Sequence, residues 1–96
     1  MLELRPVCEH CAKALPNGSP DAMICTFECT FCRDCVQNFL QNVCPNCGGG
    51  FERRPTRPAE KLEKYPAGTK ATVRPVVPES FAPLLQRYRA VAPERR

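Results

Sequence analysis

The 96-residue chain has no cysteine after residue 47 and no long run of apolar residues. No stretch approaches the roughly 20 apolar residues that a membrane-spanning helix needs. The first six residues, Met-Leu-Glu-Leu-Arg-Pro, also lack the apolar run and cleavage site of a secretory signal. We therefore expect a cytoplasmic protein with no membrane partner. Thiols stay reduced in that compartment, which favours metal binding over disulfides for closely spaced cysteines.

Apolar side chains other than cysteine are also scarce in the first half of the chain. A segment of about 50 residues buries too little apolar surface to fold alone and usually needs a metal or disulfides. We expect residues 1–54 to be largely unfolded without such a cross-link. The candidate core residues are Leu2, Leu4, Val7, Leu15, Met23, Ile24, Phe27, Phe31, Val36, Phe39, Leu40 and Val43.

The sequence does contain eight cysteines in four closely spaced couples. These are Cys8 with Cys11, Cys25 with Cys29, Cys32 with Cys35, and Cys44 with Cys47. A structural zinc ion takes four ligands in tetrahedral geometry, and C-x2-C is a usual spacing for two thiolate ligands. Eight thiolates therefore complete two sites. Because a four-thiolate site leaves no open coordination position, we predict two structural Zn²⁺ ions, no catalytic residue and no small-molecule substrate.

The pattern between the cysteines predicts short strands and one helix. We expect an edge strand over residues 1–7 and a second strand over residues 23–27. Residues 28–31 are expected to turn back toward a third strand. Residues 51–53 predict the last strand. A helix is expected from Arg33 to a stop at Pro45, with an apolar face formed by Val36, Phe39, Leu40 and Val43.

Composition changes at Pro55. Seven of the eleven prolines lie from this residue onward. Residues 51–96 contain eleven basic and five acidic side chains, whereas residues 1–50 contain three basic and five acidic ones. We predict a flexible, Pro-rich, basic linker over residues 55–78.

An amphipathic helix is predicted over residues 79–92, capped by Ser80 and with Pro83 in its first turn. Its apolar stripe either closes over the core of the cysteine-rich module or docks on another protein, and the sequence favours neither. The stripe consists of Phe81, Leu84, Leu85, Tyr88 and Val91.

Residues 24–47 combine four features of a known module: Phe31 before the fifth ligand, Val36 after the sixth, a short helix, and C-P-x-C at the end. In these features the stretch resembles a RING finger, with Cys29 in the place of the usual histidine as in all-cysteine variants. The resemblance implies a cross-brace in which one zinc ion is bound by Cys8, Cys11, Cys32 and Cys35, and the other by Cys25, Cys29, Cys44 and Cys47. Sequential pairing of the first four and last four cysteines is the alternative.

A closer resemblance covers residues 1–57 and lies in the opening M-L-E-L-R-P, the run S-P-D-A-x-I-C-x-F-E-C-T-F-C and the ending C-P-N-C-G-G. These motifs are similar to those of a family of small bacterial cysteine-rich proteins of unassigned function. That similarity implies a zinc-binding fold and no particular activity.

From these patterns we predict a small, metal-stabilised α+β fold: a RING-like two-zinc module over residues 1–54, followed by the basic tail. The predicted function is non-catalytic protein–protein interaction. One alternative is a zinc- or redox-responsive switch that works by oxidation of the thiolates. Another is accessory nucleic-acid binding, in which the tail contacts phosphates through Arg53, Arg54, Arg57, Lys61, Lys64, Lys70 and Arg74.

Two neighbours of the cysteines argue against a ubiquitin ligase. The groove that the RING resemblance implies generally needs an aliphatic residue between the first two ligands, where Glu9 and His10 stand. Ligases also tend to carry a basic residue after the last ligand, where Gly48 stands. With eight thiolates filling two sites, we expect His10 to be an exposed residue and not a ligand.

Overall fold

A computed structural model describes all 96 residues and shows a small α+β fold built from short elements. Strands β1 (Ala22–Ile24), β2 (Thr30–Cys32) and β3 (Glu52–Arg53) form one antiparallel sheet in the order β2-β1-β3. The π-helical turn η1 (Cys35–Phe39) follows β2, and the 3-10 turn η2 (Ala59–Lys61) follows β3. Helix α1 (Pro78–Tyr88) and the 3-10 turn η3 (Pro93–Arg95) complete the chain.

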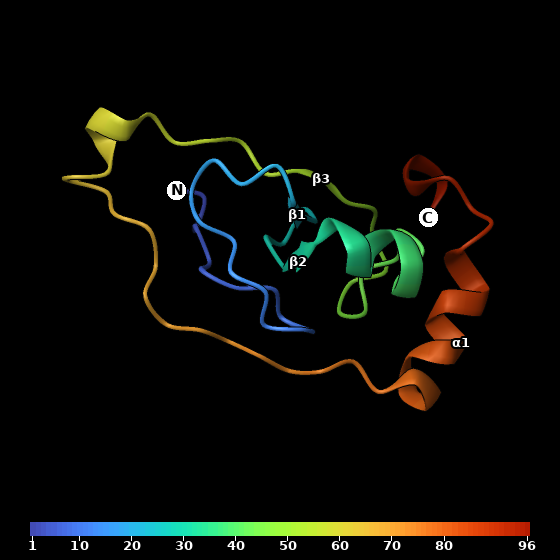
Figure 1. Ribbon diagram of the computed structural model, residues 1–96. Helices are drawn as coiled ribbons and strands as arrows, with labels where there is room; N and C mark the ends of the chain where they lie inside the picture. The colour runs from blue at the N-terminus through green and yellow to red at the C-terminus, as the bar shows by residue number, and fades with distance from the viewer.

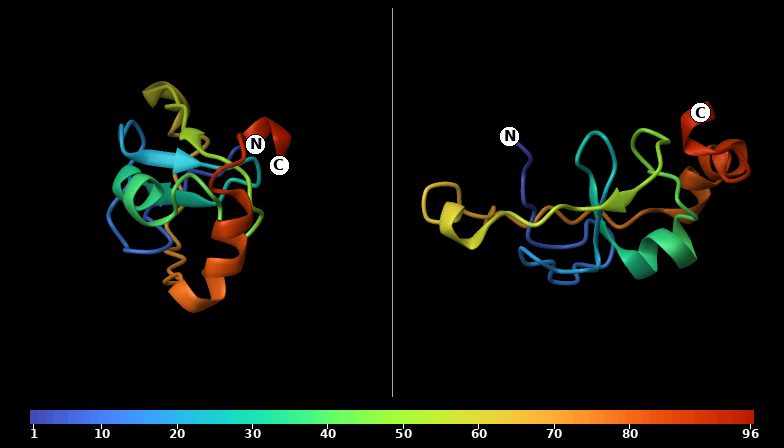
Figure 2. Two further views of the ribbon diagram at one scale, coloured as in Figure 1. Left: turned by 90° about the vertical axis from the view of Figure 1, so that its right-hand side faces the viewer. Right: turned by 90° about the horizontal axis from the view of Figure 1, so that it is seen from above.

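The sheet places the cysteine couples at its two ends. Met23 in the central strand β1 lies opposite Phe31 of β2 and Arg53 of β3. All three residues of β2 are buried, as expected for a strand that is covered on both faces. Strand β2 runs directly into the helical turn η1 (Figure 2). Cys32, the last residue of β2, and Cys35, the first residue of η1, therefore lie at one end of the sheet. Cys25 follows β1 directly at the opposite end.

The helix after β2 is shorter than the sequence predicts. Its first helical residues are Arg33 and Asp34, directly before η1, and its last is Phe39. The Leu40 N–H bonds to the Cys35 carbonyl at 2.7 Å. Gln41 and Asn42 then take left-handed conformations, with φ of 49° and 60°. Two such residues cannot continue a right-handed helix, so it ends before Pro45 is reached. The predicted apolar face is nevertheless confirmed, because Val36, Leu40 and Val43 are buried.

The two predicted strands nearest the N-terminus are corrected by the structure. Residues 1–7 form no strand; Val7 makes only an isolated bridge with Ala14, because the chain turns at the first cysteine couple. Strand β1 ends at Ile24 and not at residue 27, since Glu28 adopts a left-handed φ of 66° in the turn that leads to β2. Phe27 lies in this turn and is 71% exposed, so it is not a core residue.

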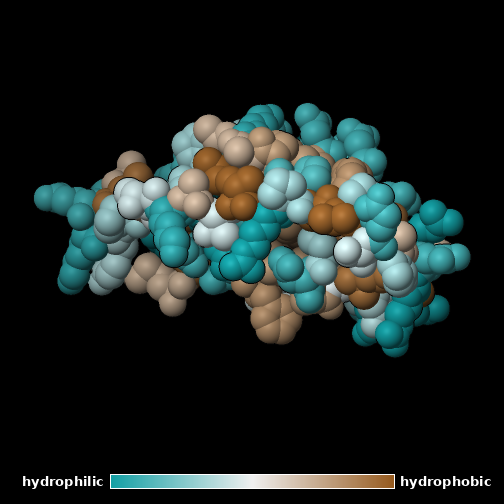
Figure 3. Space-filling view, turned by 90° about the horizontal axis from the view of Figure 1, so that it is seen from below, coloured by the Kyte–Doolittle hydropathy of each residue, from teal (hydrophilic) through white to brown (hydrophobic).

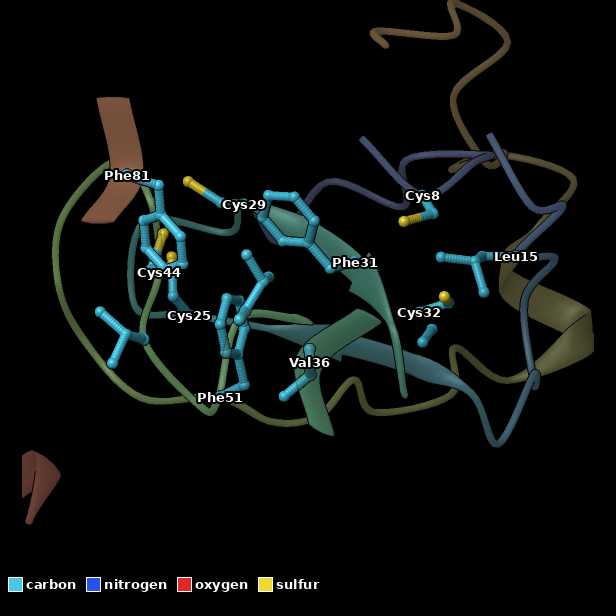
Figure 4. Close-up of a cluster of buried hydrophobic side chains, with 13 residues drawn as sticks. Cys8, Leu15, Cys25, Cys29, Phe31, Cys32, Val36, Cys44, Phe51 and Phe81 are labelled. Carbon is cyan, nitrogen blue, oxygen red and sulfur yellow. The ribbon is translucent and has the colours of Figure 1, made fainter. Parts of the chain in front are cut away.

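The core is small, and sulfur makes up much of it. Five of the thirteen residues in the buried cluster are cysteines, so the core depends on what holds their sulfur atoms. Phe31 and Phe51 meet edge to face at 5.6 Å between ring centroids. Figure 4 shows Phe31 in the middle of this cluster, with Cys8 and Cys32 on one side and Cys25, Cys29 and Cys44 on the other.

The tail leaves the sheet, runs outward to η2, and returns along the other side of the module to α1 (Figure 1). Apart from η2, residues 55–77 contain no regular element. The chain is nevertheless hydrogen-bonded to the module at intervals: Arg57 N–H to Asn17, Gly68 N–H to Leu4 and Arg74 N–H to Glu9. The mobility predicted for this segment stays a prediction.

Helix α1 packs against the core, as the first of the two alternatives for its apolar stripe predicts. Phe81 is 5% exposed and belongs to the buried cluster, and Leu84, Leu85 and Tyr88 pack against it. The helix begins at Pro78, two residues before the predicted cap Ser80, which places Pro83 in its second turn. No helix of the structure has the length and apolar character needed to cross a membrane.

Candidate metal centre

The first sulfur cluster contains Cys8, Cys11, Cys32 and Cys35, whose Sγ atoms all lie within 4.8 Å of one another. The Cys8–Cys35 and Cys11–Cys32 Sγ distances are 3.9 Å and 3.7 Å. A zinc ion with four sulfur ligands at about 2.3 Å sets the edges of its tetrahedron at about 3.8 Å. A disulfide would bring two sulfur atoms to about 2.05 Å. The spacing therefore fits a tetrahedral metal ion and not a pair of disulfides.

A tight turn presents the first couple to the cluster. The Ala12 N–H bonds to the Cys8 carbonyl at 3.0 Å, and Ala12 takes the left-handed conformation that closes the turn. The backbone N–H groups of His10 and Cys11 point at Cys8 Sγ from 3.4 Å and 3.5 Å. Backbone donors of this kind stabilise a thiolate, which is the form that binds metal.

The second cluster is built by Cys25, Cys44 and Cys47, whose sulfur atoms also lie within 4.8 Å of one another. Gly48 closes the turn between the last two: its N–H bonds to the Cys44 carbonyl at 2.8 Å, and its φ is 79°. Cys29 Sγ accepts a hydrogen bond from Asn46 Nδ2 at 3.4 Å. Its Sγ does not lie within 4.8 Å of all three of the other sulfur atoms, so the structure groups three of the four predicted ligands.

The two clusters interleave along the sequence. The first and third couples meet in one cluster, while Cys25 of the second couple meets the fourth couple in the other. This grouping is the one that the cross-brace implies, and it differs from the grouping that sequential pairing would require. Because each cluster joins segments on both sides of the other, neither can form without ordering most of residues 8–47.

Burial acts on most of these thiols in the same direction. It raises the pKa of Cys29, Cys32, Cys35 and Cys44 above the ordinary value for cysteine. Cys11 differs: burial acts to raise its pKa, but hydrogen bonds involving the Lys13 backbone and neighbouring thiols outweigh it, and the pKa is lowered. Thiols that resist ionisation when buried need a cation beside them to be held as thiolates.

The residues between the first two cysteines are structural, and the expectation of an exposed His10 is wrong. His10 stacks on Phe39 at 4.5 Å between ring centroids, and its Nδ1 accepts a hydrogen bond from the Val76 N–H at 2.8 Å. Glu9 is 7% exposed; its carboxylate accepts hydrogen bonds from the Thr30 N–H and from Arg5. Both side chains therefore point into the molecule. Their polar residue types did not predict this orientation.

Sequence reasoning also missed Arg54, which is 3% exposed. Its guanidinium donates to the carbonyls of Arg5, Leu15 and Pro16 at 2.9, 2.9 and 3.2 Å. Burial lowers the pKa of this group. Arg54 thereby joins the first turns of the module to the end of β3, and nothing in the run Arg53-Arg54 distinguishes it from its exposed neighbour.

Fold and site together define a small cysteine-rich α+β protein with two interleaved sulfur clusters that can hold metal ions. Residues 1–57 match the family described as "Protein of unknown function (DUF1272)". This match covers more than half of the chain, which therefore belongs to that family.

A protein of Rhizobium meliloti (strain 1021), described as uncharacterized, is 59% identical over 75 residues, which cover 78% of this chain and 89% of the relative. The aligned stretch is longer than residues 1–57 and therefore includes part of the tail. No solved structure matches the chain.

Proposed function

We propose that the protein is a non-catalytic module that two structural zinc ions hold in a RING-like cross-brace, and that it presents its surface to another protein. The observation that carries the proposal is the interleaved grouping of the sulfur atoms, with distances of 3.7 and 3.9 Å in the first cluster. An all-sulfur tetrahedral set favours zinc among the divalent metals common in proteins. The function rests on reduced thiols and so suits a reducing compartment such as the cytoplasm.

Zinc in this arrangement supplies folding energy and no catalysis. Structural zinc contributes about 10–16 kcal/mol of apparent binding free energy in small zinc modules, which exceeds what a core of this size supplies. The chain's own residues hold the ligands in place: backbone N–H groups face Cys8 and Cys47, and Asn46 faces Cys29.

Phe27 supports a protein partner. It is 71% exposed in the turn between Cys25 and Cys29, where the cluster fixes the backbone beneath it. Beside it lies a hollow of about 560 Å³, whose lining includes residues 48–50 and Tyr88. A rigid exposed aromatic next to a hollow is a usual anchor at protein interfaces. The face seen from below carries only separate apolar patches between polar side chains (Figure 3).

The experiment has two parts. Native mass spectrometry of the reduced protein should find two zinc ions per chain, and a metal-free folded protein would contradict the proposal. A photo-crosslinker at position 27 should then capture one specific protein in cells, while the same group at Lys61, in the turn far from both clusters, should not. Equal capture from both positions would remove Phe27 as the contact.

The nucleic-acid alternative is weakened by how the tail uses its arginines. Arg54 and Arg57, two of the seven basic residues assigned to phosphate contact, donate instead to backbone carbonyls of the chain itself. Binding to DNA or RNA that falls steeply between low and moderate salt would restore this alternative.

A further inference from the structure

The two sulfur clusters differ in how completely they enclose a metal ion. In the first, four Sγ atoms all lie within 4.8 Å of one another. In the second, three Sγ atoms meet this limit and that of Cys29 does not. In the view of Figure 4 the Cys29 sulfur is drawn apart from those of Cys25 and Cys44. The hydrogen bond from Asn46 Nδ2 gives the Cys29 sulfur a partner that does not depend on a metal.

Cys29 also lies in the wall of a cleft of about 610 Å³ between the module and the returning tail. One side of the cleft is formed by the turn that carries Pro45 and Asn46, and the other by the extended tail. The residues of the extended tail that line the cleft are Lys70, Thr72, Arg74, Pro75, Val76 and Val77. None of the cysteines of the first cluster lies in its wall.

The free charges of this cleft are positive. Lys70 and Arg74 line it and form no ion pair. The two carboxylates in its wall, Glu3 and Glu9, are both paired with Arg5, at 3.4 Å and 2.8 Å. A small anion in this cleft therefore meets two cations that have no ion-pair partner, in the same cavity whose wall includes Cys29.

We propose that the second cluster is an exchange site, in which Cys29 is a displaceable ligand and a small anionic ligand, such as a thiolate or carboxylate, enters through this cleft to take its place. The inference rests on the proposed binding of zinc. In the exchange one anionic sulfur leaves the coordination shell and one anionic donor takes its place, so the charge of the site is conserved. The released Cys29 sulfur keeps its hydrogen bond from Asn46 and takes up a proton from solvent.

A matched pair of cysteine variants tests the asymmetry, with native mass spectrometry as the readout. Cys29→Ser should retain two zinc ions per chain, since three sulfur atoms and an exogenous ligand still complete the second site. Cys32→Ser removes a ligand of the enclosed site and should lose at least one ion. If Cys29→Ser loses an ion as Cys32→Ser does, Cys29 is a permanent ligand and the inference is wrong.

A ligand titration of the unmodified sequence keeps the test independent of whether a variant folds. With Co²⁺ in place of zinc, the visible spectrum reports the ligand set, and mercaptoacetate serves as the probe. Its addition should change the spectrum of one of the two ions, with saturation and without metal loss. No change, or an equal change at both ions, would overturn the inference.

Charge reversal in the cleft supplies the specificity control. Lys70→Glu combined with Arg74→Glu should weaken mercaptoacetate binding at least about tenfold, because the approach then carries the charge of the ligand. Lys61→Glu combined with Lys64→Glu changes the net charge equally but lies outside the cleft, and should leave the affinity unchanged. Equal effects of the two pairs would contradict a role for the cleft. Failure to bind any metal would instead refute the proposed function itself.

Discussion

Residues 1–54 and residues 55–96 are ordered by different physical means. The first part is cross-linked by two sulfur clusters and by the buried guanidinium of Arg54. The second part is attached by the buried ring of Phe81 and by hydrogen bonds spread along its length, whose partners in the first part are Leu2, Leu4, Glu9, His10, Asn17, Asn42 and Gly48. Under the proposed function, the order of the first part depends on the supply of metal, whereas that of the second depends on packing against the first.

This difference predicts a one-way dependence between the two parts. The tail can detach while the module stays folded, because no cluster ligand lies beyond residue 47. The module cannot unfold and leave the tail in place, since Phe81 would lose the surface it packs on. Local opening of the weaker part without global unfolding is the usual behaviour of such a structure.

Cys32→Ser should have the largest effect and remove the order of both parts. It leaves three ligands in the enclosed cluster and removes a share of a binding free energy of about 10 kcal/mol or more, while the whole domain is stable by only about 5–15 kcal/mol. We expect loss of dispersed amide signals across the NMR spectrum, including those of α1. A variant that keeps both metals and an unchanged melting curve would refute the assignment of Cys32.

Arg54→Met should rank second and should act on the module. The carbonyls of Arg5, Leu15 and Pro16 lose a charged donor, and hydrogen bonds to charged groups contribute about 1.5–3 kcal/mol each, so we expect a loss of about 5 kcal/mol or more. Arg53→Met is the matched control, because this neighbour is exposed and makes no such bonds. Urea unfolding of the two metal-loaded variants measures the difference; equal midpoints would contradict the structural role of Arg54.

Phe81→Ala should loosen the tail and leave the module intact. Truncation of a buried phenylalanine typically costs about 3 kcal/mol or more, but here the loss falls on contacts between α1 and the core. Amide hydrogen exchange should accelerate in α1 and remain slow in β1 and β2. Phe27→Ala removes the same side chain from an exposed position and should change neither. Acceleration throughout the molecule would mean that the two parts form one cooperative unit.

Gly48→Ala should have the smallest effect of the four. A Cβ there would lie 2.8 Å from Cε2 of Tyr88, and the φ of 79° adds a left-handed strain of about 1–2 kcal/mol. Gly18→Ala provides the control: its φ of 89° carries similar strain, but the nearest atom is 3.8 Å away. Faster exchange at the end of α1 in the first variant alone would confirm the contact with Tyr88, and identical behaviour of the two would dismiss it.

The sequence predicts the local features of this molecule well, because they repeat at short intervals. The couples of cysteines, the apolar face around Val36 and Leu40, and an amphipathic helix near the C-terminus all follow from spacing within one turn or loop. The interleaved grouping came from resemblance to a known module, since spacing alone leaves sequential pairing open.

The contacts that the sequence did not predict join distant positions. His10 and Val76 are 66 residues apart, and Arg54 and Arg5 are 49 apart. Histidine and arginine have the same appearance in a sequence whether they face solvent or a buried carbonyl, so only the folded chain shows their partners. The early end of the helix at Phe39 has a similar origin, because Gln41 and Asn42 take up left-handed conformations that their residue types permit but do not require.

Titration of the reduced, metal-free protein with Zn²⁺, followed by amide NMR, tests most directly whether metal binding and folding are one event. The interlocked clusters predict a single conversion: signals from segments around both clusters and from α1 should appear together and reach full intensity at two ions per chain. A native spectrum before any zinc is added would contradict the account. So would a spectrum in which one cluster is complete and the rest of the module is still unfolded.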